Sequence, residues 1–266
     1  MTRPPRPRGL EWAVVAAAGC WALGLVGLPL GALVWSVADR PAEVVTSLVM
    51  EGGLDALGRS LLLAAVGVVL GLVTGTAGGL VLSRYRPPGR GALDALVDTP
   101  LAVSPVIAGL SFVILFGRGG WFSPLLEAAG VRVLFALPGL VLATAFVTLP
   151  FFAREVALVL DEVGTSEEDG ARTLGASEWQ VFRWITLPHL RGALRAGTLL
   201  TVARALGEFG AVLVLGGAID GRTQTATTFV HTMIEERHDA AAFGMSLVLA
   251  ALTILLVRAL PGPAQR

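Results

Sequence analysis

The 266-residue chain contains no lysine and no asparagine, and it has only one cysteine and three histidines. A phosphate-binding Walker loop requires a lysine, so the chain cannot supply a standard P-loop ATPase site, and Schiff-base chemistry is excluded for the same reason. The lone Cys20 excludes a disulfide framework and a cysteine-based metal site. Because His189, His231 and His238 are scattered along the sequence, we expect no metal site.

Charge is also scarce, since charged residues make up 15% of the chain and hydrophobic residues 54%, with a mean hydropathy of +0.73. These values are typical of a polytopic membrane protein and not of a soluble domain. The 33 glycines suit close packing of helices in lipid. The formal net charge is zero, which argues against a nucleic-acid partner.

Six apolar stretches are each long enough to cross the roughly 30 Å hydrocarbon core of a bilayer. They are residues 12–38, 60–83, 99–117, 133–153, 196–219 and 240–257. Only the fifth contains charged residues, Arg204 and Glu208. The first stretch follows several arginines, as in a signal peptide, but it is too long for the apolar region of one, so we expect an uncleaved first helix. We therefore predict an all-α protein with six transmembrane helices.

Arginine is unevenly distributed over the segments between these stretches. The N-tail has three, the second connection three, the polar region between the fourth and fifth stretches five and the C-tail two. The alternate connections hold six in all, namely Arg40, Arg59, Arg118, Arg132, Arg222 and Arg237. The positive-inside rule then places both termini and the polar region in the cytoplasm. We accordingly expect a cytoplasmic N-tail (1–11), a transmembrane domain (12–260) with a cytoplasmic loop at 161–192 between helices 4 and 5, and a cytoplasmic C-tail (261–266).

The cytoplasmic loop contains a polar helix–turn–helix element, TSEEDGARTLGASEWQVFRWITLP, at residues 165–188. Two overlapping pairs, Thr165 with Glu168 and Ser166 with Asp169, have the spacing of a capping box, which predicts a helix start. Gly175 stands where that helix should end, because glycine adopts the left-handed cap without strain. The first half of the element is therefore predicted to be a short, independently capped helix.

Ser177 and Gln180 form a further capping box and predict a second helix, which Pro188 should interrupt. Trp179 and Phe182 would share one face of it, either inserted into a partner or packed back on the membrane helices of this chain itself. A membrane protein seldom needs so well delimited a polar element unless something docks on it. We therefore predict that a partner protein binds at this membrane face.

The spacing of this element resembles the EAA loop of ABC importer permeases, in which the loop forms coupling helices that dock in a groove of the ATPase subunit. The resemblance implies that the coupling residues here are Glu168, Asp169, Gly170, Ala171, Gly175, Ala176, Trp179, Leu187 and Pro188. The leading Glu and first Ala of the motif are replaced by Asp169 and Gly170. Asp keeps the negative charge that a helix N-terminus favours, Gly170 costs the helix ~1 kcal/mol relative to Ala, and Glu168 is an alternative acidic group.

Four further segments resemble ABC-type sulfate permeases, and most of all the second of their two paralogous subunits. They are RYRPPGR (84–90), VDTPLAVSPVIAGLSFVILFGRGGW (97–121), FALPGLVLATAFVTLPFFARE (135–155) and RALGEFGAVLVLGGAIDGRTQT (204–225). The resemblance spans roughly residues 55–258. It implies an inner-membrane subunit that forms a heterodimer with a sister permease. Two ATPase subunits that bind ATP and Mg, and an extracytoplasmic sulfate-binding protein, would complete the importer.

The resemblance also implies alternating access driven by the partner ATPases, with no cofactor and no catalytic site in this chain. Thiosulfate is a second candidate substrate, and a molybdate or tungstate permease is the alternative, because those proteins share a segment like ARALGEFGA. An ion-coupled secondary transporter is a further alternative, but it would need no docking element. An intramembrane enzyme would need paired catalytic groups. The dispersed Asp94, Asp98, Glu155 and Asp161 do not provide them.

Arg204 and Glu208 lie four residues apart in the fifth stretch, so on a helix they face the same side and can form an ion pair. Charges within a membrane are expensive and indicate a functional role. The pair has three possible roles: it braces or gates a helix contact, Arg204 contacts the anion, or the pair faces the sister subunit.

The third stretch is interrupted by two serines, a proline and a glycine, namely Ser104, Pro105, Gly109 and Ser111. The candidates for a translocation path are Ser104, Gly109 and Ser111 in the third stretch and Thr144 and Thr148 in the fourth. Broken helices are tolerated where they line a cavity, so these residues could form a path of hydroxyls and backbone dipoles. The alternative is ordinary kinks in packed helices.

The outer connections are also distinct. The connection at residues 118–132 starts with a turn-rich sequence, which predicts that a short interfacial helix follows. The connection at residues 220–239 is long and polar enough to offer a docking surface to a soluble partner. The alternative is that both segments only connect helices.

Overall fold

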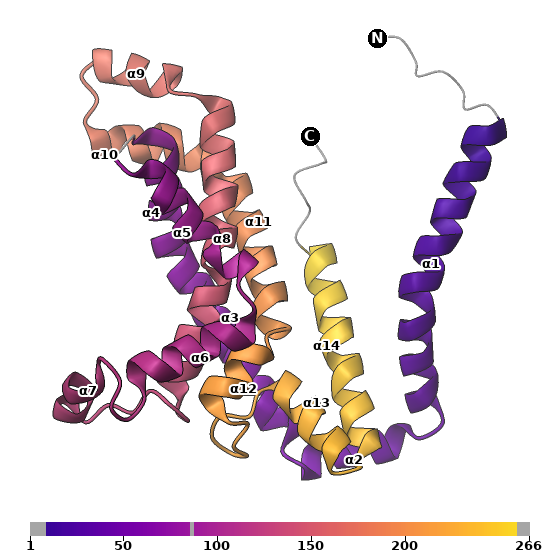
Figure 1. The fold of residues 1–266 in the computed structure, drawn as a ribbon. Coiled ribbons are helices and arrows are strands. Elements are labelled where there is room, and N and C mark those ends of the chain that lie inside the picture. The colour runs from indigo at the N-terminus through magenta and orange to yellow at the C-terminus, as the bar shows by residue number, and fades with distance from the viewer. Residues whose placement is uncertain (1–8, 86–87, 260–266) are drawn as a thin grey trace.

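The computed structural model describes residues 9–85 and 88–259. All regular secondary structure in that part of the chain is helical, and turns and loops connect the helices (Figure 1). The first half contains α1 (Gly9–Ala38), α2 (Pro41–Met50), α3 (Gly53–Leu70), the π-helical turn η1 (Gly71–Gly75), α4 (Thr76–Arg84), α5 (Arg90–Ala102), α6 (Pro105–Phe116) and α7 (Ser123–Ala129). The second half contains α8 (Leu137–Val163), α9 (Ser166–Thr173), α10 (Glu178–Val181), the π-helical turn η2 (Phe182–Thr186), α11 (Leu187–Leu206), α12 (Gly210–Gly216), α13 (Ala226–Glu235) and α14 (Asp239–Ala259). The all-α prediction is confirmed. Arg3, Arg6, Arg8, Arg86 and the C-tail 261–266 lie outside the described residues.

Among the residues that the structure describes, four helical stretches are long and apolar enough to cross a membrane unbroken: residues 12–38, 53–84, 137–163 and 239–256. Two further spans are bent pairs. α5 and α6 meet at 112°, and the stretch from α10 through α11 meets α12 at 57°. If each bent pair counts as one span, the total is the six that hydropathy predicts. The third and fifth spans are therefore broken helices and not straight rods.

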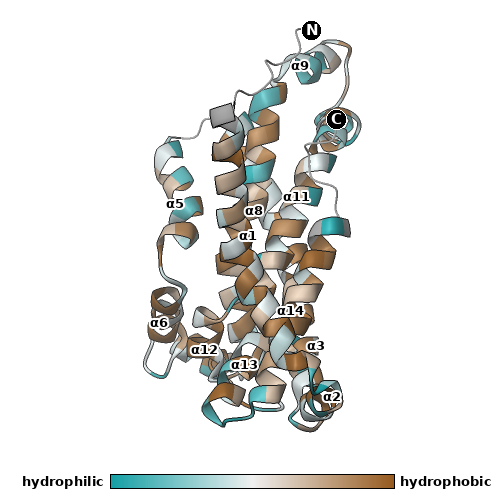
Figure 2. Cartoon of the chain, turned by 90° about the vertical axis from the view of Figure 1, so that its right-hand side faces the viewer, coloured by the Kyte–Doolittle hydropathy of each residue, from teal (hydrophilic) through white to brown (hydrophobic). Residues whose placement is uncertain are grey.

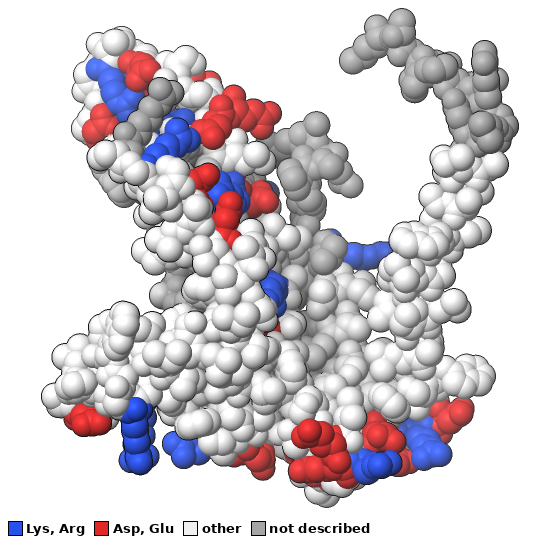
Figure 3. Space-filling view, viewed as in Figure 1, with Lys and Arg blue, Asp and Glu red and all other residues white. Residues whose placement is uncertain are grey.

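Polar and charged residues gather at the two ends of the bundle. Figure 2 shows the long helices as largely apolar, with polar residues in α9 and in the loops at the opposite end. Figure 3 shows a largely uncharged band between two charged ends. The start of α1, the α9–α10 loop and the end of α14 lie at one end, and α2, α7 and α13 lie at the other (Figure 1). The loop and both ends of the described chain thus lie toward one side of the band, and their cytoplasmic orientation stays a prediction.

The core is organised around α8, which packs against α3, η1, α4, α5, α11 and α12. Its Phe152 is fully buried and faces a hole made by glycines of two neighbouring helices. A Cβ at Gly75 would lie 2.5 Å from Phe152 Cβ, and one at Gly197 would lie 2.8 Å from its ring. A Cβ at Gly71 would also overlap the ring. These glycines are therefore required for the close approach of α8 to η1 and α11.

Helix α1 stands apart from this core (Figure 1). None of its membrane-length window is buried, and its main neighbours are α14 and α2. Trp12, Trp21 and Trp35 are all exposed on it. Such a helix is stable only if lipid or another chain covers its apolar surface.

The glycine hole predicts a sharp difference between two alanine substitutions in one helical stretch. Gly75→Ala places a methyl against Phe152 and 3.2 Å from the backbone nitrogen of Ala153, whereas Gly78→Ala makes an ordinary 3.8 Å contact. We expect Gly75→Ala to destabilise the protein by about 1–3 kcal/mol through overpacking. Gly78→Ala should be neutral or stabilising by up to ~1 kcal/mol. Thermal unfolding of both variants in detergent measures the difference, and equal stabilities would contradict this account of the core.

Candidate functional site

Helix α9 ends at a glycine cap, as the sequence predicts. Gly175 has φ +87°, its N–H donates to the carbonyl of Arg172 (3.0 Å), and the N–H of Ala176 donates to the carbonyl of Ala171 (3.1 Å). This pair of hydrogen bonds is the Schellman motif, which closes a helix through a residue in the left-handed region. Any other residue at position 175 would be strained there.

The start of α9 differs from the prediction. Thr165 is the N-cap residue, but its side chain makes no capping hydrogen bond. Glu168, the expected partner in the capping box, is only 5% exposed and points into the protein. The predicted box is therefore wrong, because Glu168 has stronger, charged partners elsewhere in the chain.

Those partners form a clamp, defined here as Arg84, Glu168 and Thr186. The Glu168 carboxylate accepts hydrogen bonds from Arg84 Nε (3.0 Å) and Nη2 (3.3 Å) and from the Thr186 hydroxyl (2.9 Å). Arg84 also donates to the carbonyls of Leu160 (2.8 Å) and Gly164 (2.7 Å) at the end of α8. One guanidinium group thus joins the ends of α4 and α8 to α9, and Glu168 joins α9 to η2. A buried charge is stabilised only when it is paired and hydrogen-bonded in this way.

The second helix begins as predicted. The Gln180 side chain accepts from the Ser177 N–H (2.7 Å) and the Gln180 N–H donates to the Ser177 hydroxyl (3.4 Å), which completes a capping box. The expected interruption at Pro188 is wrong, because α10 continues through η2 into α11 as one helical stretch. Pro188 is the second residue of α11, just after the π-helical turn η2, where its missing N–H is accommodated without ending the helix.

The loop presents an apolar surface at the end of the bundle. Leu174 is 89% exposed, Trp179 65% and Trp184 71%. A hollow of ≈ 380 Å³ lies between Leu174 and Trp184, lined by Ala171, Leu174, Gly175, Ala176, Gln180, Val181, Trp184 and Ile185. Large exposed apolar side chains around a concavity are typical of a protein-binding site.

The other predicted coupling residues border this surface. Gly170 is exposed, and Leu187 and Pro188 are half-buried where α11 begins. Asp169 is exposed and pairs with Arg172 (2.8 Å), which also binds Glu178 on α10 (2.8 Å). Hydrogen bonds to these two carboxylates raise the pKa of Arg172, so the guanidinium stays charged and links α9 to α10 across the turn.

The intramembrane charges pair as their spacing predicts. Arg204 Nη1 lies 2.7 Å from Glu208 Oε2, and the Glu208 side chain is buried. Glu208 Oε1 also accepts the N–H of Ala211 (3.0 Å) in the first turn of α12, and its backbone carbonyl accepts from the Thr227 hydroxyl (2.6 Å). Glu208 therefore sits at the bend between α11 and α12 and caps the second half. Of the three predicted roles, this geometry favours bracing of a helix contact.

The remaining candidates for the translocation path are not brought together. Thr144 and Thr148 are buried, and their hydroxyls donate to carbonyls one turn earlier in α8. Gly109 is buried where α6 packs on α12, and a Cβ there would lie 2.9 Å from Val214. Ser104 is the exposed N-cap residue of α6, and Ser111 is exposed and bonds within α6. Within this chain, helix packing explains the buried members better than a pore does.

Two sets of ion pairs between helices were not predicted from the sequence. Arg154 on α8 binds Asp94 (2.7 Å) and Asp98 (2.7 and 2.6 Å) on α5, and Arg84 belongs to the clamp. The four-residue spacing of Asp94 and Asp98 places both on one helix face, which was an available signal for the first set. No local pattern marks Arg84, because its partner lies 84 positions away.

The clamp predicts that two arginines of the same region differ in their effect on stability. Arg84→Ala leaves the Glu168 carboxylate buried without its ion-pair partner, which we expect to cost about 3–5 kcal/mol. Arg172→Ala removes two exposed ion pairs, with Asp169 and Glu178, and a long 4.0 Å contact with Glu168, so it leaves Glu168 paired with Arg84 and should change stability far less. Thermal unfolding, together with protease sensitivity of residues 165–186, measures both effects. Equal losses in the two variants would refute the clamp, and Arg84→Met/Glu168→Leu should recover part of the stability.

Comparison with known proteins gives the chain a family. Residues 67–260 match the family described as "Binding-protein-dependent transport system inner membrane component". Sulfate permease 2, chloroplastic, of Chlamydomonas reinhardtii is 48% identical over 76% of this chain, which spans about half (54%) of that protein. The sulfate transport system permease protein CysW of Synechocystis sp. is 38% identical, with 94% of this chain and 91% of that protein covered. The corresponding CysT of Escherichia coli is 36% identical, with 86% and 83% covered.

A solved structure agrees with the fold. A bacterial ABC transporter involved in the import of the acidic polysaccharide alginate contains a chain that superposes with a TM-score of 0.76 over 94% of this chain and 92% of its own, at 18% identity. The relatives include both the CysW and the CysT paralogue, so the more specific prediction of the second paralogue is not distinguished from the first. The helical, multi-pass architecture fits the description of an inner-membrane component. The chain therefore belongs to the family of binding-protein-dependent transport system inner-membrane components, alongside the sulfate transport system permeases.

Proposed function

We propose that this chain is the membrane-spanning permease subunit of an ATP-driven sulfate importer. The observation that carries the proposal is the exposed apolar hollow on the α9–α10 loop, which a secondary transporter would not need. The substrate is inferred from the relatives named as sulfate permeases, among which the Synechocystis protein aligns along nearly its whole length. Thiosulfate is a second candidate cargo, and molybdate or tungstate is the alternative.

In this proposal the loop end of the bundle faces the cytoplasm, and an ATPase subunit that binds ATP and Mg docks on the hollow. Both chain termini would be cytoplasmic, in agreement with the excess of arginine on that side. A sister permease would cover apolar surface that this chain leaves exposed, and an extracytoplasmic sulfate-binding protein would dock at the opposite end. The chain itself would supply no catalytic group.

The contacts of the loop suggest how ATPase movement reaches the membrane helices. The clamp of Arg84, Glu168 and Thr186 fastens α9 to the ends of α4 and α8. α10 runs without a break through η2 into α11. When the ATPases close on ATP, the loop, α4, α8 and α11 would therefore move together. The displacement reaches the braced bend at Glu208, where α12 begins, and opens the permease pair outward.

Transport itself tests the substrate. Membrane vesicles that contain this chain with the other subunits of its importer should accumulate radiolabelled sulfate only with ATP and binding protein. Excess molybdate should leave that uptake nearly unchanged. Uptake abolished by molybdate, or absent for sulfate and present for molybdate, would move the assignment to the alternative.

A single exposed residue tests the docking surface. Leu174→Asp places a charge at the rim of the hollow without touching the core. We expect normal insertion and stability but a loss of ATP-driven uptake of about tenfold or more, because a desolvated charge opposes docking. The control is Glu162→Ala, at an exposed position on the last turn of α8. Co-purification of the ATPase with each variant gives an independent measure, and full uptake by Leu174→Asp would refute docking at this hollow.

A further inference from the structure

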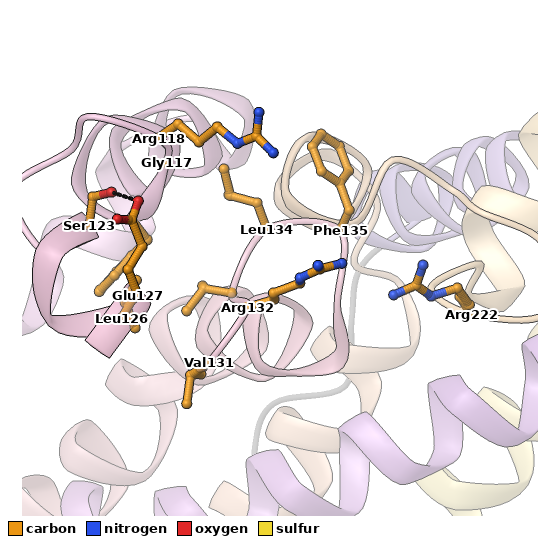
Figure 4. Close-up of a pocket in the computed structure, with 12 residues that line it drawn as sticks. Gly117, Arg118, Ser123, Leu126, Glu127, Val131, Arg132, Leu134, Phe135 and Arg222 are labelled. Carbon is orange, nitrogen blue, oxygen red and sulfur yellow. Dashed lines mark hydrogen bonds between the residues drawn. The ribbon is translucent and has the colours of Figure 1, made fainter. Parts of the chain in front are cut away.

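A second concavity lies at the end of the bundle opposite the coupling loop. It has a volume of ≈ 560 Å³ and mostly apolar walls from Phe116, Leu126, Val131, Val133, Leu134 and Phe135. Three arginines line it from three different connections (Figure 4). Arg118 follows α6, Arg132 lies between α7 and α8, and Arg222 lies between α12 and α13.

These arginines carry uncompensated charge. Within residues 9–85 and 88–259, none of the three side chains has a hydrogen bond or an ion pair with another residue of the chain. The one acidic residue of the pocket, Glu127, accepts a hydrogen bond from the Ser123 hydroxyl (2.9 Å). Figure 4 shows Glu127 turned toward Ser123, whereas the guanidinium groups of Arg132 and Arg222 point toward one another. The pocket is therefore electropositive, and its arginines repel each other unless an anion lies between them.

The loop that carries Arg222 is held rigidly. The Thr223 hydroxyl donates to the Gly216 carbonyl (2.6 Å) and accepts from the Ile219 N–H (3.0 Å), and it is buried. Arg59 Nε donates to the carbonyl of Gln224 (2.7 Å) from α3. The Arg222 backbone is thus fixed before any ligand arrives, which lowers the entropic cost of binding.

The segment that carries Arg132 is fastened to the same region. The Phe135 N–H donates to the carbonyl of Leu215 in α12 (2.8 Å), and the Val131 N–H donates to the carbonyl of Leu126 in α7 (3.0 Å). The turn after Arg118 is closed by a hydrogen bond from the Phe122 N–H to the Leu115 carbonyl (3.0 Å). Three separately supported loops thus hold the arginines around one space.

We propose that Arg118, Arg132 and Arg222 form a binding site for a tetrahedral oxyanion, and that its ligand is the sulfate cargo on its way from the binding protein into the permease. This inference rests on the proposed function and on the orientation that goes with it. The planar fork of guanidinium donors matches tetrahedral oxyanions, and apolar walls strengthen the attraction. The positive-inside rule disfavours arginine on this face, yet three of the six arginines assigned to it meet here. A lipid phosphate has the same chemistry, so the test must separate the two sources.

Direct binding tests the site. The complete transporter, without its binding protein and in nanodiscs of zwitterionic lipid, should bind radiolabelled sulfate saturably. Arg132→Gln/Arg222→Gln should weaken that binding at least tenfold, because two charge-assisted contacts are lost, and Arg132→Lys/Arg222→Lys should weaken it less. The matched control is Arg237→Gln, at an exposed position of the α13–α14 connection outside this pocket. Equal sulfate affinity of the wild type and the Gln variant would overturn the proposal.

Two further arms separate the alternatives. If phosphatidylglycerol in the nanodisc displaces sulfate from the wild type, the pocket holds a lipid phosphate and the assignment to cargo is overturned. If the Gln variant binds sulfate normally but needs more binding protein for half-maximal uptake, the pocket is a docking surface for an acidic protein face, which also overturns it. If the wild-type transporter takes up sulfate but the Gln variant binds sulfate as tightly as the wild type, the site is refuted and the function stands. Arginine-dependent binding without any uptake would refute the function, and with it the assignment of the ligand to transported cargo, while the anion site itself would stand.

Discussion

The insertion of Phe152 into a hole lined by glycines is the contact on which the rest of the structure depends. Because Gly71, Gly75 and Gly197 have no side chains, α8 can approach η1 and α11 closely enough for backbone and ring to touch. That approach brings the ends of α4, α8 and α11 to one place, where Arg84 reaches Glu168. The buried ion pair of the loop is thus possible only because the membrane helices below it are tightly packed.

The bent spans provide a different kind of contact. α6 and α12 are the second halves of two broken spans, and they pack on each other. Gly109 of α6 faces Val214, and Gly210 of α12 faces Pro105 and Val106. Glu208 caps the first turn of α12 through Oε1, and its Oε2 forms the ion pair with Arg204, so the bend is a defined structure. The tightly packed bundle and the bend capped by Glu208 are thus two distinct structural units of the chain, and the proposed mechanism would have the bundle move and the region beyond the bend respond.

Local chemistry predicted much of this architecture from the sequence. Hydropathy located the spans, the left-handed cap at Gly175 and the box at Ser177 followed from short-range rules, and the pairing of Arg204 with Glu208 followed from helix geometry. The failures involve distant partners. Glu168 does not cap α9 as predicted, because its carboxylate binds Arg84 in another helix. The three arginines of the pocket come from three separate loops. Neither arrangement has a local signature, because each depends on tertiary packing.

The unbroken passage from α10 through η2 to the end of α11 has a mechanical consequence. Residues 178–206 form a rod of about 43 Å at the usual helical rise, with the partner surface at one end and the bend at Glu208 at the other. A tilt of about 5° at the docking end displaces the far end of such a rod by roughly 4 Å. If a partner docks on the loop as proposed, the helix would act as a lever arm, and a small rotation of that partner would become a shift of several ångströms at the bend inside the membrane.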